Sequence, residues 1–287
     1  MAGSRILIPS AQMARRRIHY TEGANAPAAR PATGAFAHDL NERRYMWLST
    51  RPLYILFFLL PLIALHWVGS ARFLSSDSAI AAIKAERILG RFFDFFGAVS
   101  PFLPGATLIV VLIVWHVLSK DRFRIRGSVL AGMVGEAIIW TPPLVVLLAL
   151  ISAGSGGGGP PTVFQQNGQT VAISSLGWEA RLTIAIGAGI YEELLFRMIL
   201  IAAVHLIAVD LLDLKDRHGR VLAVGISAIA FAVYHQGVIG PGWAVNLPLL
   251  LAFTVAGVYF GALFLWRGFG IVVGVHAAYD IVVLLLG

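Results

Sequence analysis

The chain has 287 residues, of which 58% are hydrophobic and 13% charged, and it contains no cysteine. A soluble domain of this length would carry about a quarter charged residues, so the composition indicates a polytopic membrane protein. The absence of cysteine excludes disulfides, thiolate metal sites and a cysteine nucleophile. The net charge of +7 reports orientation in the membrane through basic loops, and we expect no nucleic-acid partner.

Residues 1–45 are predicted to form a tail separate from the membrane domain of residues 46–287. The tail holds the arginine run Arg15 to Arg17 and an Ala/Pro/Gly-rich piece from Gly23 to Gly34. Its apolar content is too low for independent folding, so we expect a disordered cytosolic tail. An organelle transit peptide is the alternative, because the tail is rich in arginine and poor in acidic residues. It has no apolar core of the signal-peptide type, so we expect it to be retained.

Seven apolar runs follow the tail, each near the ~20 residues that cross ~30 Å of hydrocarbon. The fold class is therefore predicted to be all-α, a polytopic bundle of seven transmembrane helices. The runs are Leu53 to Ala71, Phe102 to Leu118, Val129 to Ser152, Leu182 to Val209, Val221 to Gln236, Leu247 to Trp266, and Phe269 to Leu286. The mixed stretch from Ala79 to Gly97 is predicted to be an amphipathic helix at the membrane interface; as a span it would make eight crossings.

The loops between the runs alternate in charge. Basic residues gather before Leu53, in residues 120–126 and in residues 210–220, whereas residues 153–177 carry no charge and nor do residues 237–246. The positive-inside rule then places the N-terminus in the cytosol and, for seven spans, the C-terminus outside. We expect an integral multi-pass protein of a bacterial plasma membrane, surrounded by the lipid bilayer.

Ionisable residues at membrane depth are the first candidates for a functional site, because a charge in hydrocarbon costs roughly 2.5–3.5 kcal/mol or more. In the last four runs they are Glu192, Glu193, Arg197, His205, His235, His276 and Asp280. Glu193 and Arg197 are four residues apart, so they share a helix face and can pair. Glu192 points about 140° away from Arg197. We expect Arg197 to neutralise Glu193 and Glu192 to face a reaction site.

His276 and Asp280 are also four residues apart and share a face of the last helix. A carboxylate there can accept one imidazole N–H and leave the other ring nitrogen for substrate or metal. His235 ends an apolar stretch one turn after Phe231. A purely structural network of these side chains is the alternative interpretation.

Four other polar residues have less defined roles. Glu136 lies in the middle of the third run without a local partner, and either completes the same network or is a feature of packing. The isolated histidines are expected to lie at the interface or to be hydrogen-bonded to a neighbour; they are His66, His116 and His205.

Three motifs occur in sequence on separate predicted helices: Glu192-Glu193-x-x-x-Arg197, Phe231-x-x-x-His235 and His276-x-x-x-Asp280. In this order they resemble the CPBP family of CAAX prenyl proteases and bacteriocin-processing proteins. That family, also called Abi, is related to the Ras-converting type of intramembrane endopeptidase. The resemblance covers residues 181–287, where it implies a catalytic core, and residues 1–180 carry no motif that matches.

The resemblance implies a role for each matched residue. Glu192 would activate water, His235 would assist it, and His276 with residue 280 would stabilise the oxyanion. The best-studied branch of the family has Asn where this sequence has Asp280. An ionised carboxylate cannot donate to an oxyanion, so Asp280 is either protonated or orients His276, and we expect the latter.

We therefore expect an intramembrane endopeptidase that hydrolyses a peptide bond of a membrane-associated protein or peptide with water activated by glutamate and histidine. The sequence requires no cofactor. One alternative is a zinc-dependent version of this protease, with the metal held by His235, His276 and either Glu192 or Asp280. The other is a non-catalytic membrane binding or immunity scaffold. Counted at 1.5 Å per residue, the three motifs differ in depth by about 10 Å, which helix tilt or a longer fifth helix must absorb.

Overall fold

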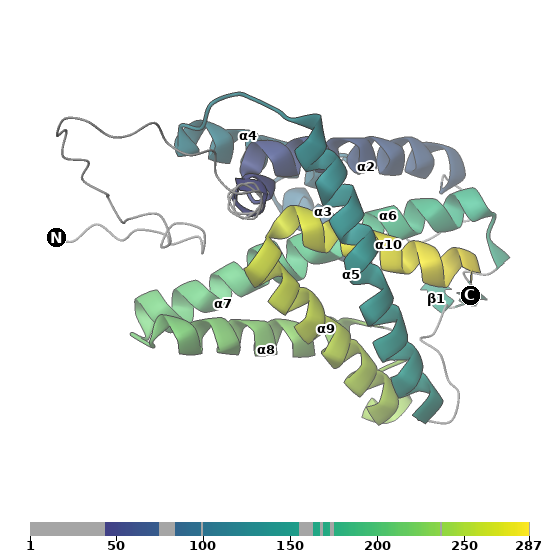
Figure 1. The fold of residues 1–287 in the computed structure, drawn as a ribbon. Helices are drawn as coiled ribbons and strands as arrows, with labels where there is room; N and C mark the ends of the chain where they lie inside the picture. The colour runs from purple at the N-terminus through teal and green to yellow at the C-terminus, as the bar shows by residue number, and fades with distance from the viewer. Residues whose placement is uncertain are drawn as a thin grey trace, which may run out of the picture.

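The computed structural model describes residues 44–74, 84–98, 100–154, 163–166, 169–172, 175–235 and 237–286. Within these ranges the protein is a bundle of helices with one small hairpin of strands (Figure 1). The predicted tail lies outside the described residues except for residues 44 and 45, which begin a short helix over residues 44–49.

Each of the seven apolar runs is helical. The first three helices of this kind are α2 (Pro52–Phe73), α4 (Leu103–Ser119) and α5 (Gly127–Gly154). The fourth run is one long stretch built from α6 (Trp178–Glu193), η3 (Leu194–Ile201), α7 (Ala202–Leu206) and η4 (Ile207–Leu211). The last three are α8 (Asp216–Tyr234), α9 (Leu247–Arg267) and α10 (Phe269–Leu286). The predicted amphipathic stretch contains α3 (Lys84–Phe95), and a 3-10 turn, η5 (Pro241–Trp243), precedes α9.

Local sequence explains where several helices begin and end. Proline stands in the first turn of α2, α4 and α9, where its missing N–H would have no helical partner anyway. The side chain of Asn246 caps α9 by accepting a hydrogen bond of 3.2 Å from the backbone N–H of Leu249. Gly268, with φ of 82°, separates α9 from α10, because glycine adopts this conformation without steric cost.

Four helical stretches in the described part of the chain are long and apolar enough to cross a membrane: Pro52–Phe73, Gly127–Ile151, Trp178–Leu211 and Leu247–Arg267. Two further apolar helices, Leu103–Ser119 and Phe269–Leu285, are shorter. The prediction of a helical, integral membrane protein is confirmed, but the count of seven or eight crossings is not. The charged first turns of α8, residues 216–220, make its composition less apolar than the run that predicted it.

The hairpin is the exception to the predicted all-α class. β1 (Val163–Gln166) and β2 (Gln169–Ala172) pair in antiparallel register, with Val163 opposite Ala172 and Gln166 opposite Gln169. Both strands fall within the uncharged loop of residues 153–177. Their valine, threonine and phenylalanine residues favour extended structure, but a search for runs of about 20 apolar residues does not detect four-residue strands.

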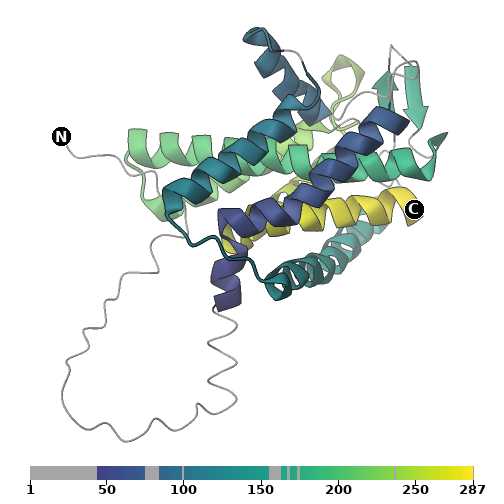
Figure 2. The same cartoon turned by 90° about the horizontal axis from the view of Figure 1, so that it is seen from above.

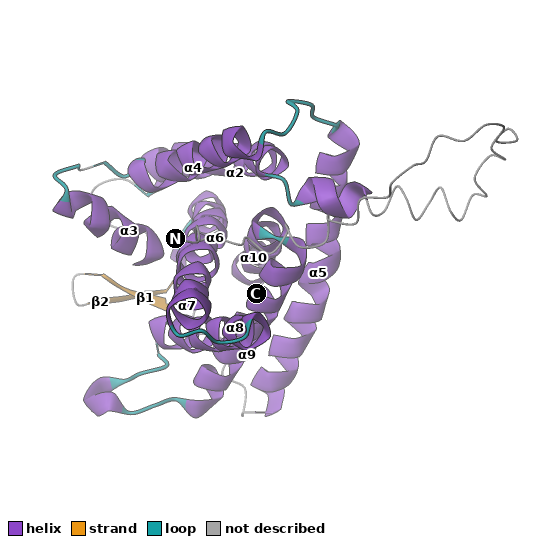
Figure 3. Cartoon of the chain, turned by 90° about the vertical axis from the view of Figure 1, so that its left-hand side faces the viewer, coloured by secondary structure: helices purple, strands orange, loops and turns teal. Residues whose placement is uncertain are grey.

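The arrangement of the helices places α6 and α10 in the middle of the bundle (Figure 3). Seen from above in Figure 2, α2 and α4 lie side by side and cross the long helical stretch that begins with α6. α5 packs along α10, and α8 pairs with α9. The carboxyl end of α6, the end of α8 and the middle of α10 therefore meet in the interior.

The close approach of α6 and α10 depends on a glycine. A Cβ atom built at Gly189 would lie 2.7 Å from the backbone nitrogen of Ala277 and 2.8 Å from its Cβ. Backbone atoms cannot move away as a flexible side chain could, so only glycine fits here. Ala277 follows His276 directly, so Gly189 also sets how near His276 comes to the end of α6.

Gly189→Ala is expected to lower the free energy of unfolding by about 1–3 kcal/mol, because the added methyl overpacks the contact between α6 and α10. Gly225→Ala in α8 is the matched control, since a Cβ there meets nothing within 4 Å. That change should be neutral or stabilising, by up to about 1 kcal/mol. Thermal unfolding of both variants in detergent measures the difference, and equal melting temperatures would contradict the packing argument.

Candidate active site

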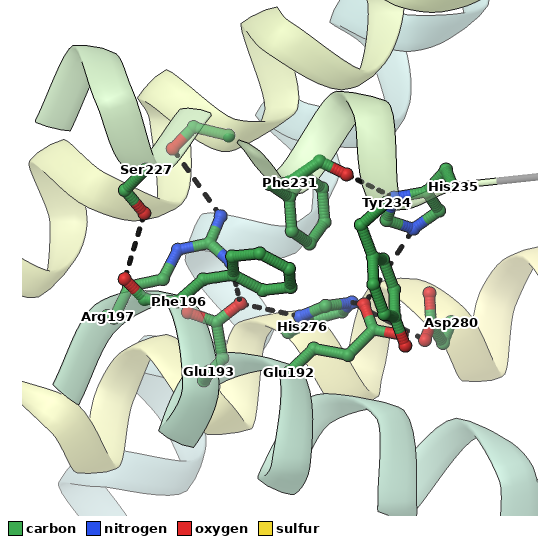
Figure 4. Close-up of polar contacts among 11 residues, drawn as sticks. Glu192, Glu193, Phe196, Arg197, Ser227, Phe231, Tyr234, His235, His276 and Asp280 are labelled. Atoms are coloured by element: carbon green, nitrogen blue, oxygen red, sulfur yellow. Dashed lines mark hydrogen bonds and ion pairs between the residues drawn. The ribbon is translucent and has the colours of Figure 1, made fainter. Parts of the chain in front are cut away.

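Three charged side chains lie at the junction of α6 and η3. Glu192 and Glu193 are the last two residues of α6, and both are buried. The wider π-helical turns of η3 begin at the next residue; such turns occur frequently at functional sites. Arg197 in η3 is buried as well, and its Nη1 lies 2.9 Å from Oε1 of Glu193. The predicted pairing of Glu193 with Arg197 is thus present (Figure 4).

Aromatic rings enclose the Arg197 guanidinium. Its Cζ lies 4.4 Å from the ring centre of Phe231 and 5.1 Å from that of Phe260, within the range of cation–π attraction. Nη2 donates to the backbone carbonyl of Gly257 over 3.4 Å. The buried arginine therefore joins η3 to α8 and α9.

His276 is held by the neighbouring glutamate. Its Nδ1 lies 2.7 Å from Oε1 of Glu193, and because a carboxylate accepts, Nδ1 carries the proton. Nε2 faces the other way, 3.5 Å from Oδ2 of Asp280 and 3.9 Å from Oε2 of Glu192. We expected Asp280 to orient this ring; the shorter contact, a hydrogen bond, comes instead from Glu193.

His235 is fixed by the end of its own helix. It follows the last residue of α8 and has extended backbone angles. Its Nδ1 donates to the backbone carbonyl of Phe231 over 2.7 Å, so Nδ1 carries a proton. Nε2 takes no part in this hydrogen bond. Nε2 lies 3.7 Å from Oε2 of Glu192.

The two carboxylate oxygens of Glu192 differ in their surroundings. Oε1 accepts a hydrogen bond of 3.1 Å from the hydroxyl of Tyr234. Oε2 is buried and has no hydrogen-bond partner among the described residues, and the Nε2 atoms of His235 and His276 lie 3.7 and 3.9 Å from it. Both distances exceed a hydrogen bond. The structure thus brings together the four residues expected to share a site, in spite of the depth mismatch counted from the sequence.

The ends of the helices explain why the mismatch disappears. The stretch Trp178–Leu211 is 34 residues long, or about 50 Å at 1.5 Å per residue, so it either tilts or extends beyond ~30 Å of hydrocarbon. The apolar run that predicted it begins four residues later and ends two residues earlier. Depth counted from the ends of an apolar run is therefore a poor guide to where Glu192 lies relative to the histidines.

Sequence reasoning missed three aromatic residues of the site. Phe253 stacks on His235, with ring centres 4.0 Å apart, and Phe260 stacks on His276 at 4.5 Å. These phenylalanines are seven residues apart, two helical turns, so they share a face of α9; this spacing was the available signal. Tyr234 is adjacent to His235 in the chain and offered no other signal.

Glu136 does not belong to this site. It pairs with Arg267 at the end of α9, and the hydroxyl of Tyr45 donates to its Oε2 over 2.6 Å. Arg267 also donates to the hydroxyl of Ser49 over 3.0 Å. Burial, reinforced by the Glu136 carboxylate, raises the pKa of Tyr45. The open question about Glu136 is answered by this second network, which ties the segment before α2 to α5 and α9.

Two of the isolated histidines have neighbours as partners, as expected. Nδ1 of His66 lies 3.1 Å from the backbone carbonyl of Thr183, and Nε2 of His205 lies 3.0 Å from Oδ1 of Asp216. Nδ1 of His116 is buried and has no hydrogen-bond partner within the described ranges. None of the three contacts the site.

The zinc alternative concerns the donor atoms of the two histidines and the neighbouring carboxylates. Within the described residues, no group of three His, Asp or Glu side chains is arranged to hold a metal ion. The zinc alternative requires His235, His276 and a carboxylate around one ion, and it stays a prediction.

Comparison with known proteins gives one match. Residues 174–282 match the family model described as type II CAAX prenyl endopeptidase, Rce1-like. The matched segment contains the three motifs and every residue of the site described above. Searches of the curated proteins and of the solved structures gave no match. Residues 174–282, which carry the three motifs, are therefore similar to the Rce1-like type II CAAX prenyl endopeptidases, a family of peptidases.

Proposed function

We propose that the protein is an intramembrane endopeptidase in which Glu192 activates the water that hydrolyses the peptide bond. One observation carries the proposal: Oε2 of Glu192 is buried without a hydrogen bond among the described residues, between the Nε2 atoms of two histidines. A buried carboxylate oxygen without a partner is costly, and a site that binds water and a scissile carbonyl would account for it.

The mechanism follows from the positions of the nitrogens. A water molecule between Oε2 of Glu192 and Nε2 of His235 would donate to both, and Glu192 would take a proton from it as general base. The hydroxide attacks the scissile carbonyl carbon, and the carboxyl of Glu192 then passes the proton to the leaving amine. Water is thereby added across the bond, giving one new carboxyl and one new amino terminus without a covalent intermediate.

His276 is placed to stabilise the oxyanion. With both ring nitrogens protonated, it donates from Nε2 to the developing negative charge while Nδ1 stays on Glu193. Its positive charge would be balanced by the nearby carboxylates of Glu193 and Asp280. In this assignment Asp280 does not contact the oxyanion, which resolves the difficulty of having Asp at a position where an ionised side chain cannot donate.

The substrate class we propose is a membrane-associated protein or peptide with an unwound segment at the scissile bond, because a helical backbone hides its carbonyls in hydrogen bonds. The matched family is described as a type II CAAX prenyl endopeptidase. No motif in this sequence indicates a binding site for a prenyl group. The experiment below therefore does not assume that the substrate is prenylated.

Comparison of the termini of membrane proteins tests this function. Membranes from cells that make the wild-type protein or Glu192→Gln are digested and their native termini are identified by mass spectrometry. Termini found only with the wild type would identify substrates and cleavage sites. Identical sets of termini would contradict the protease function and favour the binding or immunity scaffold.

Chelation separates the proposed mechanism from the zinc alternative. Because the proposed mechanism activates water with Glu192 and His235 and uses no metal ion, cleavage by the purified protein is expected to continue at an unchanged rate after treatment with 1,10-phenanthroline. Metal analysis of the same sample is the companion measurement. Loss of activity that added zinc restores would contradict the metal-free mechanism.

A further inference from the structure

We propose that Tyr234 is a positioning residue for Glu192, and that Lys84 of α3 positions Tyr234 by capping the end of α8. The proposal deepens the proposed function, on which its catalytic consequence rests. It also gives α3 a part in the site, although α3 lies far from residues 174–282 in the sequence.

The hydroxyl of Tyr234 forms a hydrogen bond with one of the two carboxylate oxygens of Glu192. It donates to Oε1 over 3.1 Å, and Oε2 is then the oxygen that faces His235 and His276. The ring of Tyr234 packs edge-on against Phe196 of η3, with ring centres 5.1 Å apart. Tyr234 does not need to contact the reacting atoms; it fixes the rotation of the carboxylate that does.

The end of α8 is capped by two groups from outside its regular hydrogen bonds. The last carbonyls of a helix have no intrahelical donor. At this end Nδ1 of His235 donates to the carbonyl of Phe231, and Nζ of Lys84 donates to the carbonyl of Tyr234 over 2.7 Å. The Lys84 charge also lies 4.6 Å from the centre of the Tyr234 ring, and a cation is favourable at the negative end of a helix.

The placement of Lys84 follows from the packing of α3. One face of this amphipathic helix is buried through Ala85, Glu86 and Leu89, and it packs against α6 and α4. Oε2 of Glu86 lies 3.5 Å from Nε2 of His66 on α2. Burial lowers the pKa of Lys84, as does the charge of Arg87, whereas the Glu192 carboxylate acts in the opposite direction. Lys84 thus connects α3 to the residue that holds Glu192.

The kinetic test uses a peptide substrate taken from the terminal comparison above and protein reconstituted in liposomes. Tyr234→Phe keeps the ring and removes only the hydroxyl, so kcat is expected to fall by about tenfold to a hundredfold with KM unchanged, as for loss of one hydrogen bond to a charged group. Lys84→Met should lower kcat less, by a few-fold. Arg91 is exposed on α3, so Arg91→Met is the matched control and should leave kcat unchanged.

A double-mutant cycle separates positioning from a general effect on the fold. If Lys84 acts through Tyr234, Lys84→Met should cause no further loss of kcat in the Tyr234→Phe background. If the two substitutions instead lower kcat independently, so that their effects multiply, the proposed action of Lys84 through Tyr234 on Glu192 is wrong. Melting temperatures of the single variants check that each is folded.

Infrared spectroscopy gives a readout that does not need cleavage. The carboxyl band of Glu192 is assigned by its disappearance in Glu192→Gln, and it should shift in Tyr234→Phe but not in Arg91→Met. An unmoved band in Tyr234→Phe overturns the positioning proposal. A shifted band in a protein that cleaves nothing would support the positioning of Glu192 and count against the protease function instead.

Discussion

Glu192→Gln is expected to lower kcat by about two to four orders of magnitude, the usual contribution of a general base, and at the same time to raise the melting temperature. The amide keeps the shape of the side chain and can still accept from Tyr234, but it cannot take a proton from water. It also removes a buried charge whose Oε2 has no hydrogen bond among the described residues. Relief of that cost should raise the melting temperature by a few °C, about 2–4 for each kcal/mol.

The adjacent glutamate provides the control. Glu193→Gln makes the same chemical change one residue along, but Oε1 of Glu193 is paired with Arg197 and His276. Its loss leaves the buried arginine uncompensated, so the melting temperature should fall. Opposite shifts in the two variants, measured by thermal unfolding in detergent, would support the division between a reacting and an anchoring carboxylate. A Glu192→Gln enzyme that retains the wild-type rate would exclude the proposed mechanism.

Arg197→Met is expected to cause the largest loss of stability, about 3–5 kcal/mol, because it leaves Glu193 buried without its cation. Methionine retains an apolar chain against Phe231 and Phe260, so the change tests the charge more than the packing. Denaturant titration of the purified protein in detergent micelles measures the effect.

A second substitution, Glu193→Gln, removes the negative charge that Arg197→Met leaves without its partner. Arg197→Met combined with Glu193→Gln should recover part of the lost free energy, because neither member of the pair is then left charged without the other. A double variant as unstable as the sum of the two single variants would show that the pair is not the source of the stability.

The helices of this protein were predictable because each apolar run is long and the loops between them are charged or rich in glycine. The number of crossings was not, because it depends on helix lengths and tilts that composition does not set. α8 illustrates the problem: the run of Val221 to Gln236 predicts a span, but the helix begins at Asp216 and carries charged residues in its first turns.

Contacts within one helix were also predictable from spacing, as Glu193 and Arg197 show. The hydrogen bond from His276 to Glu193 was not, because it joins α10 to α6 and depends on their close approach at Gly189. Tyr234 and Lys84 were missed for the same reason. Their contacts join residues 42 and 150 positions apart in the chain, and no periodicity within a single helix reveals such pairs.

The most direct test of the mechanism is the mass of the products. Purified wild-type protein and Glu192→Gln, each reconstituted in liposomes, are given the same membrane peptide, and the fragments are weighed by mass spectrometry. The proposed mechanism predicts two wild-type fragments whose masses sum to that of the peptide plus one water, and no fragments from Glu192→Gln. Equal amounts of the same two fragments from both proteins would contradict it.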